Sequence, residues 1–119
     1  MTEKDLREII ELAEQGRIQF KERAMDKYDI ACEMCAFCNS KGGRLIVGVK
    51  DKSGELNPLS YNELQETTNR LSLIAKDGVV PSITISIENV KVDGGAVVVA
   101  EIPQGHSKPY HDTKGVVWI

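Results

Sequence analysis

The sequence predicts an α+β fold, a two-layer sandwich in which helices cover one face of a mixed sheet. Three observations predict it. Apolar residues recur at helical period in three segments, other segments alternate or run apolar like strands, and Gly- and Asp-rich turns separate them. With 119 residues, 41% of them apolar and 28% charged, and a net charge of −3, the chain has the size and composition of a single domain, residues 1–119.

The amino-terminal third is predicted to form a helix, a strand and a second helix. Thr2 and Asp5 have the spacing of a capping box, and an apolar stripe follows as far as Gly16, a residue typical of helix ends. The segment 17–21 alternates and predicts a short strand. The helical pattern then returns over 28–39.

The middle of the chain is predicted to form a buried strand and a third helix. A nearly continuous apolar run over 44–49 follows two glycines, which is typical of a strand buried on both faces. Turn residues come next. Ser60 and Glu63 then form a second capping box, which opens a helix over 60–76.

The last third is predicted to be mainly strand. Strict alternation over 83–92 indicates a half-buried strand, and a DGG turn joins it to a second arm over 96–102. The final residues VVWI (116–119) are predicted to begin another strand. Because no residue closes that strand, we expect the chain to be the amino-terminal part of a longer protein.

All three cysteines lie in the segment CEMCAFCNSKGG, residues 32–43, at two successive C-x-x-C spacings. Iron–sulfur proteins use this spacing on loops. Here it falls in a helical pattern, which spreads the three side chains over about 120° of one helix face. We therefore predict that Cys32, Cys35 and Cys38 are reduced, helical and mostly buried, with no bound metal and no other cofactor. The odd number of cysteines also indicates a reducing compartment, so we expect a cytoplasmic protein.

The glycines after the cysteines do not fit a phosphate-binding loop. Such a loop runs from strand to helix, so that the helix N-terminus faces the phosphates. Residues 39–45 run from helix to strand instead. A thioredoxin-like redox site is disfavoured as well, because its C-x-x-C opens a helix. We expect Gly42 and Gly43 to permit a turn and close packing of the helix against the sheet.

Four segments together resemble the Schlafen AlbA-like domain. They are EQGRIQFKE (14–22), CAFCNSKGGRLIVGVKDKSG (35–54), GVVPSITI (78–85) and AEIPQGHSKPYHDTKGVVWI (100–119). The most specific part is AFCNSKGGRLIVGV, which is similar to the family's Ala-Phe-Ala-Asn-x-x-Gly-Gly block and the Gly-Val after it. The resemblance implies an AlbA-like α+β sandwich related to small archaeal chromatin proteins. It also implies a place at the amino terminus of bacterial transcriptional regulators.

The resemblance implies three family positions for a metal-dependent endoribonuclease site, namely Glu14, Gln19 and Asp51. Glutamine at the second position cannot supply the carboxylate charge with which such sites hold divalent cations. Lys50 adds a positive charge beside the third position. Both departures favour a non-catalytic domain, and a Schlafen-type nuclease stays the alternative.

Positive charge gathers in the middle of the sequence, where residues 17–52 hold eight bases and five acids. Five of these bases surround the predicted strand ends and the glycine turn: Lys21, Lys41, Arg44, Lys50 and Lys52. If they converge, they form a patch that contacts the phosphate backbone of DNA or RNA. A solvated charged surface explains them about as well. Aromatic residues, at 5%, are too scarce to favour stacking of single-stranded bases.

The remaining expectations concern partners. No apolar run approaches the roughly 18–20 residues that span a bilayer, so we expect no membrane contact. The resemblance to small nucleic-acid binders favours a homodimer. The alternating segment 82–92 could instead present a sheet edge to another protein. The sequence thus favours a nucleic-acid-binding domain of a transcriptional regulator, with a nuclease and a protein-interaction or dimerisation module as alternatives.

Overall fold

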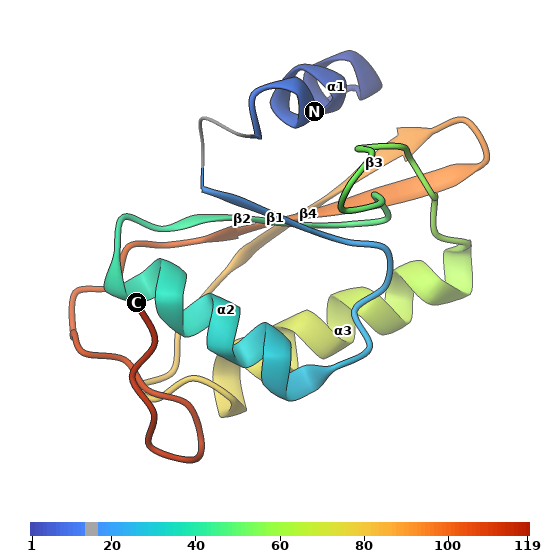
Figure 1. Cartoon of the computed structure of the whole chain (residues 1–119). Helices are drawn as coiled ribbons and strands as arrows, with labels where there is room; N and C mark the ends of the chain where they lie inside the picture. Colours follow the sequence, from blue (N-terminus) through green and yellow to red (C-terminus); the bar gives the residue numbers. More distant parts are fainter. Residues whose placement is uncertain (14–16) are drawn as a thin grey trace.

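The computed structural model describes residues 1–13 and 17–119 (Figure 1). Within these ranges the elements are, in chain order, α1 (Glu3–Glu11), β1 (Ile18–Lys21), α2 (Lys27–Asn39), β2 (Gly43–Val47), α3 (Tyr61–Asp77), β3 (Ser86–Val92) and β4 (Gly95–Ile102). In the described part of the chain no helix combines the length and the apolarity that crossing a bilayer requires.

The strands form one mixed sheet in the order β1-β2-β4-β3. β1 runs parallel to β2, with Gln19 opposite Leu45, and the other neighbouring pairs are antiparallel. A parallel pair needs a crossover connection, and α2 provides it. The predicted α+β class with a mixed sheet is confirmed.

Each helix begins at a side chain that caps it. Thr2 and Asp5 form the predicted capping box of α1, and Ser60 and Glu63 form that of α3. The carboxylate of Asp26 caps α2 by accepting a hydrogen bond of 3.0 Å from the backbone N–H three residues on. These local signals fix where the helices start, so the predicted starts agree with the structure to within one residue.

The sheet carries helices on both faces. The larger core lies between the sheet and the pair α2 and α3, which share one face as predicted. On the opposite face Leu6 of α1 packs with Ile46, Val90 and Val99. Figure 1 shows α1 on one side of the sheet and α2 and α3 on the other. The sequence predicts helices on one face of the sheet only. The structure adds α1 on the second face, because the apolar stripe of α1 packs against the face that α2 and α3 leave open.

Alternation along β2 explains why its sequence is apolar throughout. Leu45 and Val47 belong to the core under α2 and α3, while Ile46 belongs to the core under α1. All three side chains are fully buried. A strand that is buried on both faces cannot show a polar alternation, so the continuous run 44–49 was a correct signal for this strand.

The glycine turn has the structural role that the sequence predicts. Gly42 has φ +80°, and its N–H donates a 2.8 Å hydrogen bond to Phe37 O at the end of α2. A Cβ on Gly43 would lie 2.4 Å from the Phe37 ring and 2.6 Å from Arg17 O. A Cβ on Gly42 would lie 2.7 Å from Ile102 O, so neither glycine accepts a larger side chain without moving the backbone packed around the turn.

Two predicted boundaries were wrong. α1 ends at Glu11, well before Gly16, which lies outside the described residues. The strand predicted over 83–92 begins only at Ser86, which pairs with Glu101, and the backbone N–H of Ile83 donates a 3.1 Å hydrogen bond to Ala75 O of α3 instead. Residues 83–85 extend beyond the ladder.

The strand predicted over 116–119 does not form. Only Val117 makes a bridge, with His111. The neighbouring backbone N–H of Val116 bonds to the side chain of Asp112 at 3.0 Å, and Trp118 O accepts a 2.7 Å hydrogen bond from Asn39. The side chains of Asp112 and Asn39 thus form hydrogen bonds with backbone groups that a strand would use to pair with its neighbour.

The three cysteines lie on α2 in the core, as predicted. Cys35 and Cys38 are fully buried, and Cys32 is 9% exposed. All three are free thiols. Burial raises the pKa of Cys35 and of Cys38 to about 11. They behave as small apolar core residues.

We expect these thiols to be unreactive in the folded protein. At about pH 8 a thiol with a raised pKa is almost entirely protonated, and the thiolate is the reactive species. Ellman's reagent should therefore react slowly in native buffer and fully once guanidinium chloride unfolds the chain. Metal analysis of protein purified without added metal tests the accompanying expectation. Fast native reaction of all three thiols, or stoichiometric zinc or iron, would contradict the prediction.

Candidate functional site

The five bases singled out in the sequence lie at two ends of the sheet. Lys41 and Arg44 lie where β2 begins, beside the glycine turn. Lys21 ends β1, and Lys50 and Lys52 follow the end of β2. Because β1 and β2 are parallel, Lys21 belongs with the second group. The structure therefore does not bring the five together.

At the carboxyl end of β1 and β2 the charge of Lys21 is neutralised. Its ammonium lies 2.6 Å from Asp29 Oδ2 and 2.7 Å from Glu33 Oε1, both on α2. Burial alone would lower the pKa of Lys21, but the two carboxylates outweigh burial and raise it. Burial raises the pKa of Glu33, although Lys21 opposes that shift. This lysine ties β1 to α2.

Two other cations at this end have acidic partners as well. Lys50 Nζ lies 3.6 Å from Glu55 Oε2, and Arg23 Nε lies 2.7 Å from Glu63 Oε2. Lys52 is exposed in a turn. Taken together, this end of the sheet carries balanced charges and offers an anion little net attraction.

The amino end of β1 and β2 is different, because a groove opens there beside Gly43. Its volume is about 310 Å³, and its lining residues are Arg17, Ile18, Gly43, Arg44, Glu101 and Ile102. They come from the starts of β1 and β2 and from the end of β4. Two arginines, Arg17 and Arg44, flank this hollow.

The two arginines are held in register by the backbone. Arg44 N donates a 2.8 Å hydrogen bond to Arg17 O. Arg44 Nε lies 3.0 Å from Glu101 Oε1, its partner across the β2–β4 pair. The terminal nitrogens of Arg44 make no hydrogen bond to any residue that the structure describes. They can therefore donate to a ligand while Nε stays anchored.

Two lysines extend this positive end onto the loops. Lys108 Nζ donates a 3.1 Å hydrogen bond to Ser40 O, which places it next to the glycine turn. Lys41 is exposed and forms no ion pair within residues 1–13 and 17–119. We call Arg17, Lys41, Arg44 and Lys108 the amino-end patch. Arg17 and Lys108 were not among the predicted bases, because only the fold brings the start of β1 and the loop after β4 to the start of β2.

The three family positions for nuclease chemistry are only partly described. Glu14 lies outside the described residues. Gln19 is half-buried in β1, and Asp51 is exposed in the turn after β2. Within the described ranges no group of three or more His, Cys, Asp or Glu side chains is arranged to hold a metal ion.

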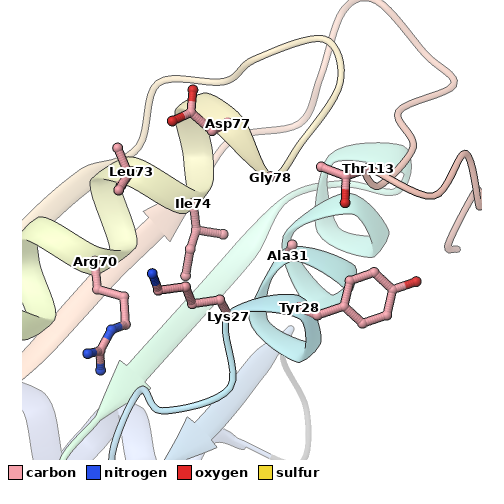
Figure 2. A pocket seen from close by; sticks show the side chains of 9 residues that line it. All are labelled: Lys27, Tyr28, Ala31, Arg70, Leu73, Ile74, Asp77, Gly78 and Thr113. Carbon is pink, nitrogen blue, oxygen red and sulfur yellow. The ribbon is translucent and has the colours of Figure 1, made fainter.

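A hollow between α2 and α3 is a second candidate (Figure 2). Its volume is about 320 Å³, and Lys27, Arg70, Leu73, Ile74 and Asp77 are among its lining residues. Figure 2 shows the guanidinium of Arg70 turned away from Lys27. That guanidinium donates a 2.6 Å hydrogen bond to Ala24 O. The cations do not converge, so this hollow has no focus for an anion.

One buried carboxylate holds the carboxyl-terminal loop against α2. Asp112 is fully buried and accepts hydrogen bonds from Tyr28 OH at 2.5 Å and Trp118 Nε1 at 2.8 Å. The backbone N–H groups of Lys114 and Val116 also donate to it, at 2.8 Å and 3.0 Å. Burial would raise the pKa of Asp112, but these donors outweigh burial and hold it well below its usual range. Nothing in the local sequence marks this residue.

Comparison with known proteins identifies relatives of this fold. Residues 14–119 match the family model described as Schlafen, AlbA_2. A solved N-terminal domain of a RecG-related protein from Nitrosomonas europaea superposes with a TM-score of 0.70 at 22% identity, covering 91% of this chain and 77% of that one. The DIP2311 protein from Corynebacterium diphtheriae superposes with a TM-score of 0.65 at 21% identity. That superposition covers 96% of this chain but only 24% of the DIP2311 protein. No curated protein matches the sequence.

We expect Asp112→Asn to destabilise the protein at neutral pH and to weaken its sensitivity to acid. The folded pKa of Asp112 is lowered, so its contribution is fully present above the unfolded value of about 4. That contribution is lost as the pH falls through the folded value. Urea unfolding at neutral and acidic pH measures both effects. Asp77→Asn, on an exposed carboxylate of α3, is the matched control. Equal unfolding midpoints for the two variants at neutral pH would contradict the prediction.

Proposed function

The chain belongs to the Schlafen, AlbA_2 family, and we propose that it binds the phosphate backbone of nucleic acid through the amino-end patch without cleaving it. The observation that supports this proposal most is the groove beside Gly43. Two arginines flank it, two lysines stand on adjoining loops, and Glu101 is the one acid among its lining residues.

The chemistry of the patch suits phosphate. Arginine and lysine donate charge-assisted hydrogen bonds to phosphate oxygens, and such contacts position a protein on nucleic acid without reading its sequence. The net charge of the whole chain is −3. Attraction to a polyanion must therefore come from a local concentration of cations, which the amino-end patch supplies.

We further propose that the domain works within a longer protein, as the DNA-binding amino-terminal part of a transcriptional regulator. One structural neighbour is itself an N-terminal domain, and this chain spans 24% of the other. Contacts with phosphate alone carry no sequence information. In this proposal the choice of target falls to the rest of the protein.

Binding should fall steeply with salt, and the amino-end patch should account for the slope. Each phosphate neutralised contributes about 0.9 to the slope of log K against log salt on duplex DNA. Replacing Lys41 and Arg44 together with alanine should therefore reduce the slope by up to about two units. Fluorescence anisotropy with mixed-sequence DNA and RNA at several salt concentrations measures this.

The structure offers a matched control for that experiment. The pair Lys50→Ala and Lys52→Ala removes the same charge from the opposite end of the sheet. It should leave the slope nearly unchanged. Equal effects of the two double variants would mean that only net charge matters. Absence of binding to any DNA or RNA at low salt would overturn the proposal.

We expect the wild-type domain not to cleave RNA. Gln19 lacks the carboxylate that the family's nuclease branch places there, so the charge available to a divalent cation is smaller. Incubation of structured RNA with wild type and with Gln19→Glu, in Mg²⁺ or Mn²⁺, tests this. The variant restores the acid and shows whether the position limits activity. Cleavage by wild type that Asp51→Ala abolishes would instead establish an enzyme.

A further inference from the structure

β3 is an edge strand whose outer side has no partner in the described chain. It ends the strand order β1-β2-β4-β3. The backbone N–H and C=O of Ala96 in β4 both form hydrogen bonds with the backbone of Leu59. These two groups of Ala96 therefore point away from β3. Backbone direction alternates along an antiparallel pair. The N–H and C=O groups of Ile87, Asn89 and Lys91 therefore point outward from the sheet.

A groove runs beside this edge, on the face that α3 covers. Its volume is about 430 Å³, and its lining residues are Tyr61, Leu64, Gln65, Thr68, Asn69 and Asn89. None of them is charged, and four carry amides or an aliphatic hydroxyl. Figure 1 shows α3 below the sheet to which β3 belongs.

One polar atom in the groove wall has no partner. The hydroxyl of Thr68 is buried and makes no hydrogen bond within the described residues. Leaving a buried hydroxyl unpaired is unfavourable, so native structures rarely do so without a reason. Thr68 is one of the residues that line the groove, so its hydroxyl lies in the groove wall.

We propose that the groove between α3 and β3 binds an extended peptide of a partner protein, which adds to β3 as a fifth strand. The outward groups of Ile87, Asn89 and Lys91 would supply main-chain hydrogen bonds, and the groove would receive alternate side chains of the peptide. This combination of an edge strand and an adjacent helix is a general way to bind extended segments. The inference is independent of phosphate binding at the amino-end patch.

The lining determines the chemistry of the peptide. Amides and a hydroxyl favour uncharged side chains with hydrogen-bonding groups, such as threonine, serine or asparagine, at the positions that face α3. A second copy of β3 fits less well. Two-fold pairing centred on Asn89 places Lys91 opposite Ile87 and Glu88 opposite Val90, so neither charge meets an opposite one.

The test uses the whole chain and a synthetic peptide of alternating Thr and Val, as long as the seven residues of β3. Titration followed by NMR should shift the backbone amides of Ile87, Asn89 and Lys91, with a Kd below about 1 mM. Two further peptides carry N-methyl groups, one on its odd residues and the other on its even residues. In the bound peptide only every second backbone N–H faces β3. The peptide methylated at those positions should therefore lose binding, and the other should keep it.

Two variants examine the protein side. Asn89→Pro removes an outward N–H and no ladder bond, so the fold should persist while binding weakens at least about tenfold. Thr68→Val removes the unpaired hydroxyl, so it should weaken binding about fivefold without lowering Tm. The pair Lys41→Ala and Arg44→Ala, in the amino-end patch, should bind the peptide as wild type does.

Unshifted edge amides at saturating peptide, or equal binding of both N-methylated peptides, would overturn the proposal even if Asn89→Pro failed to fold. Light scattering provides a further check. A dimer that Asn89→Pro dissociates, together with no peptide binding, would make a second copy the occupant and would also overturn it.

Discussion

The close approach of three backbone segments at Gly42 and Gly43 is the constraint on which the rest of the structure depends. α2 ends there with the N–H of Gly42 bonded to Phe37 O, and β2 begins against the start of β1. A side chain at Gly43 would collide with the Phe37 ring and with Arg17 O. The groove between Arg17 and Arg44 lies beside this glycine. Close packing at this glycine thus holds together the strand starts on which the candidate site lies.

Polar side chains, and not sheet pairing, hold the carboxyl-terminal segment. Asp112 receives donors from α2, from its own loop and from the indole of Trp118. Asn39, at the last residue of α2, bonds to Tyr110 and to Trp118 O. Because a buried carboxylate is tolerated only when its hydrogen bonds are satisfied, this network is expected to order the loop cooperatively. It also brings the loop that carries Lys108 to the start of β2.

The distribution of ion pairs separates two kinds of cation. Lys21 and Arg23 bridge elements and are bound to carboxylates, so their charge serves the fold. Lys41 and the terminal nitrogens of Arg44 are not taken up in this way by the described residues. The density of basic residues along the sequence does not distinguish the two kinds of cation. What distinguishes them is whether α2 or α3 places a carboxylate beside the cation in the fold.

The sequence by itself determined the elements whose signals are local. Capping boxes at Thr2 and Ser60, the apolar run of β2 and the turn before Gly95 each act within a few residues, so periodicity and turn chemistry predicted them. The motif around Gly43 also pointed to the family from the sequence alone. Tertiary structure decided the rest: which face α1 covers, that residues 116–119 are not a strand, and that Arg17 and Lys108 join Lys41 and Arg44. These depend on strand order, on apolar packing and on hydrogen bonds between residues far apart in the sequence, which no local pattern of the chain encodes.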